Sequence, residues 1–404
     1  MYEELYTNIT DEQRAIRDMA HRFAKEVLRP AANELDKLKA EEVVKSETYW
    51  NAMKQAYELG FHKILIPEIY GGLGLDPLSV HIVLEELGWG SSGLAVSIIV
   101  SCFPAVACCI FAGDNDNLIK EFVLPFTEDT KATYIGCWGI TEPDHGSDWV
   151  ASDRKTFRGN VVAKKKESFW LINGQKSAWV SNGPIATHCF LFLTIDEHEG
   201  IALVNLKDSD GVTKGKPLEK TGQRALPQGE IYFDDVKLPF ENMIVEDVEM
   251  FQFAHNSNLA LANAGMSAMF TGVARAAFEE ALRYSKERFQ GGKLIINHQT
   301  VQQILFKMYQ RVETARYFSR AAMIYNLSNF PPKEEYSIIA KVHATEAAYE
   351  NANDAIQIFG AMGLTKETEI EMIWRDARAS LIEDGSNETL SLKAAACFED
   401  LDIS

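Results

Sequence analysis

The periodicity of apolar residues changes twice along this chain, and the order of these changes constrains the fold more than any other feature. Residues 10–125 carry apolar side chains at helical spacing. Residues 130–245 form short runs rich in β-branched and aromatic residues between turn residues, and helical spacing returns after residue 250. Helices repeat every 3.6 residues and strands every two, so each pattern suits one structure only. The sequence therefore predicts helices, then a β-domain, then helices again.

Two local signals add detail to this order. Thr10-Asp-Glu-Gln13 is a capping box, and the helix that it starts is expected to run to Pro30. Asn173-Gly174 is the strongest hairpin-turn signal in the chain. It predicts that Trp179 and Ser181 lie on the strand after that hairpin.

Composition limits the size of the core and the kinds of ligand. The chain has 404 residues, of which 46% are hydrophobic and 24% charged, so two or three packed units are expected. A formal charge of −18 argues against nucleic-acid binding, because phosphate recognition needs clustered Lys and Arg. We find no apolar run of about 18 residues, and the N-terminus is polar and acidic. We therefore expect no membrane segment and a cytoplasmic location.

The cysteines and the common catalytic motifs exclude further classes. The six cysteines lack the paired CxxC spacing of metal sites, which favours reduced thiols over disulfides or zinc. No metal site is expected. GxSxG, HExxH and Walker sequences are absent, so serine hydrolases, zinc proteases and P-loop enzymes have no support. The cysteines are Cys102, Cys108, Cys109, Cys137, Cys189 and Cys397.

A polar loop follows the first predicted strand of the β-segment. Residues 136–149 read GCWGITEPDHGSDW, and such a turn exposes backbone N–H groups and small hydroxyls. These groups suit a phosphate or a cofactor whose ring has hydrogen-bonding edges. The indole of Trp179 can cover a flat ring while the hydroxyl of Ser181 meets its polar edge. Taken one at a time, an ordinary polar turn and a core tryptophan are the default explanations of these residues.

A second candidate site lies near the end of the chain. Residues 381–390 read LIEDGSNETL, with Glu383 and Asp384 before a glycine and after a helix-forming stretch. Two adjacent acids there can be a solvated helix end. A carboxylate in an apolar pocket is instead desolvated, which raises its pKa toward that of a general base near neutrality. The rest of the sequence must decide between these interpretations.

Six separated blocks follow one another along the chain: TEPDHGSD, NGQKSAWVSNG, TGQRALPQGEIYFDDVKLP, KERFQGGKLIINHQTVQQ, AIQIFGAMG and RDARASLIEDGSNE. Their order and spacing are typical of acyl-CoA dehydrogenases, and the chain resembles that family over nearly its whole length. The resemblance implies an α+β fold with an N-terminal helical domain (1–128), a middle β-barrel-like domain (129–245) and a C-terminal four-helix bundle (246–404). This organisation agrees with the periodicity.

The family resemblance also implies an activity and a set of ligands. Such enzymes bind FAD, are usually homotetramers, remove an α-proton and a β-hydride from an acyl-CoA, and pass the electrons to electron-transfer flavoprotein. The matching motifs imply FAD contacts within the subunit for Trp138, Ile140, Thr141, Trp179, Ser181 and Ser386. They imply contacts with a neighbouring subunit's FAD for Arg288, Gln299, Gln357 and Gly360. They imply substrate contacts for Ser147, through the CoA arm, and for Glu383 and Gly385.

The resemblance assigns the acidic pair a catalytic role. LIEDGS lies where the family has I-Y-E-G-T, so Asp384 takes the position of the catalytic base and Glu383 that of a tyrosine. Some branches of the family carry the base on the helix after residue 250. That helix, FQFAHNSNLALANAG, has no acidic residue here, which leaves Asp384 as the predicted base.

The same two residues bear on the substrate. Asp384 is one methylene shorter than the usual glutamate, so its carboxylate reaches about 1.5 Å less far. Glu383 replaces an apolar surface with a charge that is costly to bury unpaired. Both changes favour a compact cyclic or branched acyl group, such as cyclohexanecarboxyl-CoA, over a straight chain. If Glu383 points to solvent, an ordinary short-chain enzyme is expected instead.

Two alternative functions stay open. One is a flavin oxidase of the same fold, either an acyl-CoA oxidase or an enzyme similar to nitroalkane oxidases, which use an aspartate at the base position. The other is a non-catalytic protein that binds FAD or acyl-CoA. Loss of flavin colour on adding substrate separates a catalyst from a binding protein.

Overall fold

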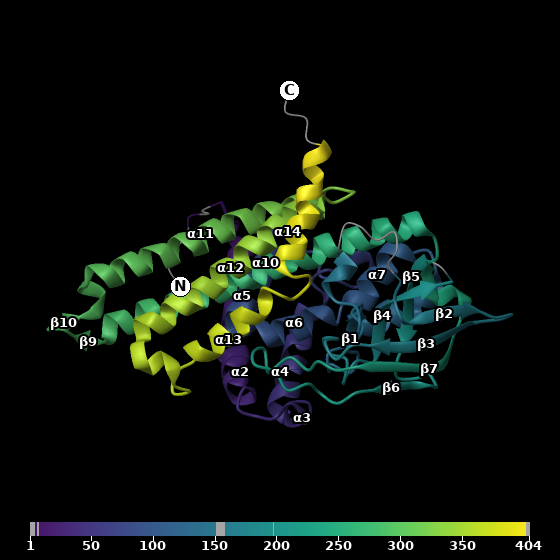
Figure 1. The fold of residues 1–404 in the computed structure, drawn as a ribbon, viewed down its shortest axis with the longest axis horizontal. Helices are drawn as coiled ribbons and strands as arrows, with labels where there is room; N and C mark the ends of the chain where they lie inside the picture. Colours follow the sequence, from purple (N-terminus) through teal and green to yellow (C-terminus); the bar gives the residue numbers. More distant parts are fainter. Residues whose placement is uncertain (1–4, 6–7, 151–157, 197, 401–404) are drawn as a thin grey trace.

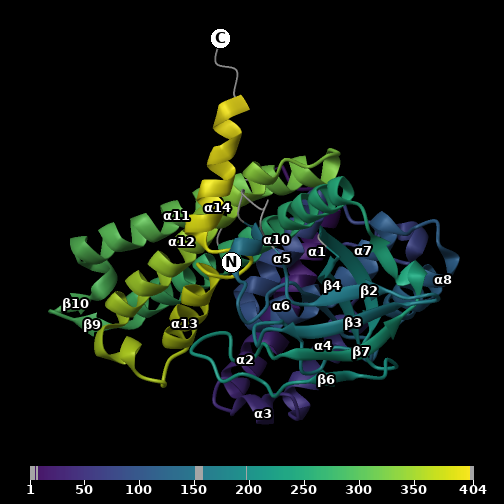
Figure 2. The same cartoon turned by 45° about the vertical axis from the view of Figure 1, so that its right-hand side comes forward.

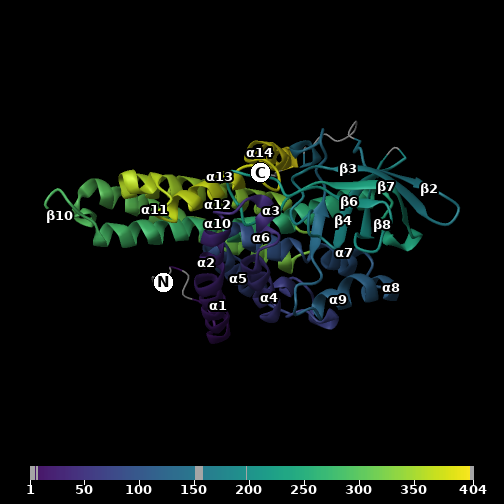
Figure 3. The same ribbon diagram turned by 90° about the horizontal axis from the view of Figure 1, so that it is seen from below.

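The computed structural model describes residue 5 and residues 8–150, 158–196 and 198–400. It has the expected order of a helical segment, a sheet and a second helical segment, and so confirms the predicted fold class. The N-terminal helices pack along one side of the sheet and of the long C-terminal helices (Figures 1 and 3). The predicted boundaries after residues 128 and 245 stay a prediction.

The N-terminal segment begins with the predicted capping box. Thr10 Oγ1 accepts a hydrogen bond from the Gln13 amide, and the Gln13 side chain accepts one from the Thr10 amide. The expected end at Pro30 was wrong, because the chain continues from α1 through a π-helical segment (Ala24–Leu28) directly into the next helix, which contains Pro30. The helices are α1 (Asp11–Phe23), α2 (Arg29–Leu35), α3 (Ala40–Val43), α4 (Glu47–Glu58), α5 (Pro77–Gly90), α6 (Ser92–Val100), α7 (Phe103–Phe111), α8 (Asp116–Leu118) and α9 (Leu124–Thr127).

One stretch corrects an expectation from the sequence. Ser92–Phe111, which spans α6 and α7, is long and apolar enough to cross a membrane by length and composition, so the statement that no such run exists was wrong. Within the fold 78% of its most apolar window is buried. Two core helices that are covered on all sides need not alternate apolar and polar residues, and this produces the continuous apolar run.

The middle segment forms one sheet whose strand order is β6-β7-β3-β2-β4-β5-β8, with β1 parallel to β4. Asn173-Gly174 was predicted to be a hairpin turn, and this was wrong: both residues lie inside β3. There the register with β7 shifts between Ile172 and Gly174, so the pair forms a β-bulge, and Gly174 has a φ of +135°. The strands are β1 (Gly136–Gly139), β2 (Val162–Lys165), β3 (Trp170–Lys176), β4 (His188–Ile195), β5 (His198–Asn205), β6 (Val212–Lys214), β7 (Ile231–Leu238) and β8 (Met243–Val245).

The C-terminal segment is built on three long helices, α10, α11 and α12, that run side by side away from the sheet (Figures 1 and 3). A small hairpin at their far end joins α10 to α11, and α14 projects from the body of the molecule (Figure 2). The helices are α10 (Val248–Glu287), α11 (Gln299–Ser328), α12 (Glu334–Phe359), α13 (Ile370–Ser380) and α14 (Asn387–Ala395), and the hairpin strands are β9 (Phe289–Gln290) and β10 (Lys293–Leu294).

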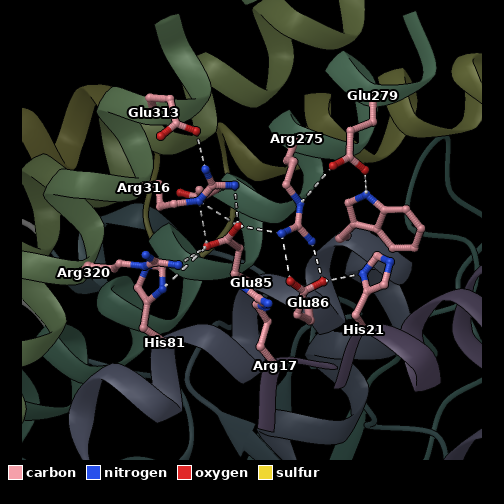
Figure 4. A network of polar contacts seen from close by, with 12 residues as sticks. Arg17, His21, His81, Glu85, Glu86, Arg275, Glu279, Glu313, Arg316 and Arg320 are labelled. Atoms are coloured by element: carbon pink, nitrogen blue, oxygen red, sulfur yellow. Dashed lines mark hydrogen bonds and ion pairs between the residues drawn. The ribbon is translucent and has the colours of Figure 1, made fainter. Parts of the chain in front are cut away.

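A buried charge cluster joins the two helical segments (Figure 4). Glu85 of α5 contacts Arg275 of α10 at 3.0 Å, and Arg316 and Arg320 of α11 at 2.9 and 3.5 Å. Glu86 also pairs with Arg275. Buried ions need this degree of pairing because leaving water is costly. The cluster therefore holds α5 against the bundle.

Candidate functional site

A cavity of about 840 Å³ opens where the three segments meet. A cavity of this size lies in the range of small-molecule sites. Part of its lining is apolar, and polar residues come from the 140–150 loop, the 220–228 loop and the turn after α13. The apolar lining includes Val96, Ile99, Val100, Phe103, Leu259, Ala262 and Met266.

The predicted loop after β1 lines this cavity. Trp138 stacks on Phe103, with ring centroids 5.3 Å apart, and its Nε1–H has no hydrogen-bond acceptor among the described residues. Ile140 and Thr141 follow it along the wall. The Thr141 hydroxyl contacts the Ser177 hydroxyl at 2.8 Å, and the Ser177 amide donates to the Thr141 carbonyl at 2.9 Å. These bonds tie the loop to the end of β3.

A fully buried ion pair supports the same loop from behind. Lys176 Nζ lies 2.7 Å from Glu142 Oε1 and donates to the Ile140 carbonyl at 3.0 Å. The Glu142 carboxylate also accepts a hydrogen bond from the Val161 amide at 3.2 Å. Burial lowers the pKa of Lys176, and the Glu142 carboxylate opposes this effect. The pair thus connects β3 to the loop by a charged group inside the core.

Trp179 and Ser181 also line the cavity, but their predicted placement on a strand was wrong. Strand β3 ends at Lys176, Trp179 lies in a turn, and Ser181 forms only an isolated bridge with Gln228. Gln228 Nε2 donates to the Trp179 carbonyl and to the Ser181 hydroxyl, each at 3.2 Å. The Trp179 side chain is 58% exposed in this chain, so its indole is free to cover a ligand.

The acidic pair follows α13 and forms part of the polar lining. Asp384 has a φ of +50° and Gly385 one of +98°, so the backbone turns sharply at the acid. The Asp384 carboxylate accepts no hydrogen bond from any described residue. Lys341 Nζ donates to the carbonyl of the next residue, Gly385, at 2.9 Å, and its charge acts on Asp384. Burial raises the pKa of Asp384, and the Lys341 charge partly opposes this.

Glu383 also faces the cavity, beside Asp384. Its Oε2 accepts a hydrogen bond from Gln223 Nε2 at 3.0 Å. Burial and then the neighbouring Asp384 raise the pKa of Glu383 to about 7. The alternative in which Glu383 points to solvent is therefore wrong.

Ser147 and Ser386 meet at the edge of the cavity. The Ser386 amide donates to Ser147 Oγ at 3.1 Å, and Ser386 caps α14 by accepting from the Thr389 amide at 3.3 Å. Ser147 and Gly385 line the cavity, and Ser386 lies immediately beside it. The two sequence blocks that carry the predicted ligand contacts are thus adjacent in space.

Four predicted residues lie elsewhere. Arg288 follows α10, Gln299 begins α11, and Gln357 and Gly360 lie at the end of α12, at the hairpin end of the bundle (Figure 1). All four are exposed, and none lines the cavity. Within one chain they cannot contact a ligand in the cavity. Their predicted role therefore requires a second subunit.

Sequence reasoning did not single out Lys220, Gln223 or Gln228, although all three line the cavity. Lys220 Nζ donates to the Leu226 carbonyl at 2.7 Å and to Gln228 Oε1 at 2.8 Å. One feature of the sequence indicates a functional role for these three residues. They lie in or beside TGQRALPQ, which is part of a block that supports the family resemblance. Their contacts join segments far apart in the chain, which local patterns do not reveal.

The cavity fits a flat ring system with polar edges. The free Trp138 N–H, the exposed Trp179 indole and the nearby Thr141 and Ser181 hydroxyls provide stacking surfaces and hydrogen-bonding groups. These are the features that an isoalloxazine needs. The described residues contain no cluster of His, Cys, Asp or Glu suited to a metal ion, and the six cysteines are free.

Comparison with known proteins gives one consistent family. Models of the acyl-CoA dehydrogenase N-terminal, middle and C-terminal domains match residues 10–123, 137–236 and 253–396. The short-chain specific acyl-CoA dehydrogenase of Rattus norvegicus mitochondria is 31% identical over 394 residues, which cover 96% of this chain and 90% of that protein.

Solved structures agree with this result. A glutaryl-coenzyme A dehydrogenase in complex with glutaryl-CoA superposes with a TM-score of 0.86 at 28% identity, over 98% of each chain. A nitroalkane oxidase superposes with a TM-score of 0.88 at 22% identity, over 99% of this chain and 98% of that chain, which shows a shared fold alone.

Proposed function

The chain belongs to the acyl-CoA dehydrogenase family, whose members use FAD, and we propose that it oxidises the Cα–Cβ bond of an acyl-CoA with Asp384 as the base. One observation carries this proposal. Asp384 lies on the wall of a cavity that apolar side chains also line, and its carboxylate accepts no hydrogen bond from any described residue. Such a carboxylate has a free lone pair and little solvent, which favours proton abstraction from carbon.

The residues around the cavity divide into two groups in this proposal. Ser147 and Gly385 contact the CoA thioester, while Glu383 contacts the acyl group. The residues that hold the flavin of the same chain are Trp138, Ile140, Thr141, Trp179, Ser181 and Ser386. FAD supplies the hydride acceptor when bound. The Thr141 and Ser181 hydroxyls orient it, and the apolar lining excludes water from the acyl group.

The remaining cofactor contacts come from a neighbouring subunit of a homotetramer. Arg288, Gln299, Gln357 and Gly360 are exposed at the hairpin end of the bundle, so they are free to meet another chain. Large exposed apolar side chains nearby support such an assembly. Phe289 is 64% exposed, Phe306 66% and Leu364 78%.

A compact cyclic or branched acyl group, such as cyclohexanecarboxyl, is the proposed substrate. The short side chain of Asp384 draws the reacting carbon toward the backbone, and Glu383 interrupts the apolar surface that a straight chain needs. We propose electron-transfer flavoprotein as the acceptor, from the family resemblance. An oxidase that uses oxygen is the competing proposal.

An anaerobic screen of acyl-CoA thioesters tests this function. Mixing each thioester with the FAD-bound protein should bleach the visible flavin absorbance, and cyclohexanecarboxyl-CoA should give a higher kcat/KM than butyryl-CoA or octanoyl-CoA. No bleaching by any thioester contradicts the proposal and favours a binding protein. Rapid recolouring in air, with stoichiometric hydrogen peroxide, favours the oxidase.

A further inference from the structure

Proton abstraction by Asp384 does not explain the environment of Glu383, the other acid of the pair. Among the described residues, the Glu383 carboxylate accepts one hydrogen bond, from Gln223 Nε2 at 3.0 Å. A carboxylate can accept about four. Most of its accepting capacity is therefore unused inside a cavity of the protein.

Gln223 is fixed in position. Its φ is +49°, a conformation that is rare outside glycine, and its amide donates to Asp376 Oδ1 at 2.5 Å. The Ser92 hydroxyl donates to the other Asp376 oxygen at 3.2 Å. The Gln223 backbone is therefore fixed, and its side-chain amide donates the hydrogen bond that holds the Glu383 carboxylate toward the cavity wall.

The nearby lysines are committed to other partners. Lys220 Nζ donates to the Leu226 carbonyl and Gln228 Oε1, and Lys341 Nζ donates to the Gly385 carbonyl and Asn387 Oδ1. Neither ammonium forms an ion pair with Glu383 in the described part of the chain. An acceptor on the wall is thus left for a ligand, and covering it with a ligand that donates no hydrogen bond to it costs free energy.

The apolar lining of the cavity defines the rest of the ligand. Ile99, Phe103, Leu259 and Met266 offer only apolar contacts. A ligand that satisfies this lining and Glu383 has an apolar body and one hydrogen-bond donor. A second carboxylate would be repelled by Glu383 and Asp384. An ammonium would be attracted by the two acids and repelled by Lys220 and Lys341, whose charges act on Glu383, so it is the competing donor in the test.

We propose that Glu383 and Gln223 form a specificity site for a neutral hydroxyl group on a compact acyl-CoA. This inference rests on the proposed function and narrows its substrate class to hydroxylated cyclic or branched acyl thioesters. Glu383 accepts the hydroxyl hydrogen, and Gln223 holds the carboxylate in the required direction. Asp384 keeps its separate role at the α-carbon.

The test compares substrates that differ by a single group. The FAD-bound protein is assayed anaerobically with cyclohexanecarboxyl-CoA and with its 3-hydroxy, 4-hydroxy and 4-amino derivatives. At least one hydroxylated ring should have a kcat/KM about 10-fold or more above that of the plain ring, the scale of a hydrogen bond to a charged acceptor. Equal or lower values for both hydroxylated rings would overturn the assignment, and so would a preference for the amine.

Variants assign the preference to Glu383. Glu383→Leu should abolish the preference for the hydroxylated ring, and Glu383→Gln should retain part of it, because an amide oxygen still accepts a hydrogen bond. Glu388→Leu, which changes an exposed acid of α14, should keep the wild-type ratio. An unchanged ratio in Glu383→Leu contradicts the proposal. If that variant does not retain FAD, the ratio in Glu383→Gln decides.

A binding measurement separates this inference from the proposed function. Asp384→Asn should bind thioesters without turnover, so calorimetry can compare the plain and hydroxylated rings in that background, with and without Glu383→Leu. Failure of the proposed function appears as no flavin reduction by any thioester in the wild-type protein. Failure of the specificity site appears as reduction, or binding, with no preference for the hydroxyl group.

Discussion

The amide of Ser386 donates a hydrogen bond to Ser147 Oγ at 3.1 Å, which joins the end of the chain to the loop after β1. The two residues are separated by 239 positions in the sequence. The contact places the turn that carries Asp384 against the predicted cofactor loop. A base and a flavin must lie on either side of the substrate, and this bond fixes the distance between their supports.

Asp384→Asn should remove turnover and leave binding intact. Asparagine has nearly the same shape but cannot accept the proton, so flavin reduction should slow about 100-fold or more. Stopped-flow absorbance under anaerobic conditions measures the rate, and calorimetry measures thioester binding. Near-normal reduction by the variant would move the base assignment to Glu383.

Lys341→Met should shift the pH profile of the reaction. The Lys341 charge opposes the burial that raises the Asp384 pKa, so removing it should raise this pKa further. The base acts only when ionised, and the acid limb of kcat/KM should therefore move to higher pH. Lys341→Arg keeps the charge and should lie closer to the wild-type profile. If the acid limb of kcat/KM does not move in Lys341→Met, the proposed effect of the Lys341 charge on Asp384 is wrong.

Lys176→Met should destabilise the fold and weaken FAD binding. The substitution leaves Glu142 buried without its partner, which costs about 3–5 kcal/mol. The loop that contains Thr141 also loses the Lys176 bond to the Ile140 carbonyl. Denaturant unfolding and FAD dissociation measure the two effects. Lys164→Met, at an exposed position of β2, is the control and should change neither.

Glu85→Gln should destabilise the protein at neutral pH, by about 3–5 kcal/mol, because three arginines lose a buried countercharge. Burial by itself would raise the Glu85 pKa, but Arg316, Arg275 and Arg320 outweigh it and hold the pKa well below its usual range. A carboxylate whose pKa is lowered by folding stabilises the folded state at pH values above its unfolded-state pKa. This contribution is lost as the pH falls through the folded-state pKa.

The difference between wild type and Glu85→Gln should therefore shrink below about pH 4.3. Thermal unfolding measured across this range tests the sign. Glu287→Gln removes an exposed partner of Arg283 and should change stability by less than about 1 kcal/mol at any pH. A Glu85→Gln effect of that small size would mean that the buried cluster is not needed for stability.

Arg288→Ala should lower FAD occupancy although Arg288 lies far from the cavity of its own chain. The planar guanidinium suits phosphate oxygens, and its loss should weaken FAD binding in an assembled tetramer. Light scattering gives the molar mass, and absorbance gives FAD per chain. Lys293→Ala, on the neighbouring hairpin strand, is the control. Full occupancy of Arg288→Ala in a tetramer would rule out the proposed contact between subunits.

Local patterns predicted most of the architecture but not its exceptions. The capping box at Thr10 and the alternation of helical and strand segments depend on neighbours within a few residues, and the structure confirms both. The hairpin turn predicted at Asn173-Gly174 was wrong because the two residues form a β-bulge in the pairing of β3 with β7. The strand predicted at Trp179 was wrong because β3 ends at Lys176. In both cases a partner distant in sequence overrides the local preference.

The sequence by itself determined the order of the three segments, the family resemblance and the acid at position 384, since each can be read from residue type and spacing. Only the tertiary structure decided that Glu383 faces the cavity, that Gln223 holds it, and that Arg288 lies at the opposite end of the bundle. These facts depend on contacts between residues more than 150 positions apart, such as Gln223 and Glu383. Periodicity specifies which face of an element is buried, but the packing of whole elements determines which side chains share a cavity.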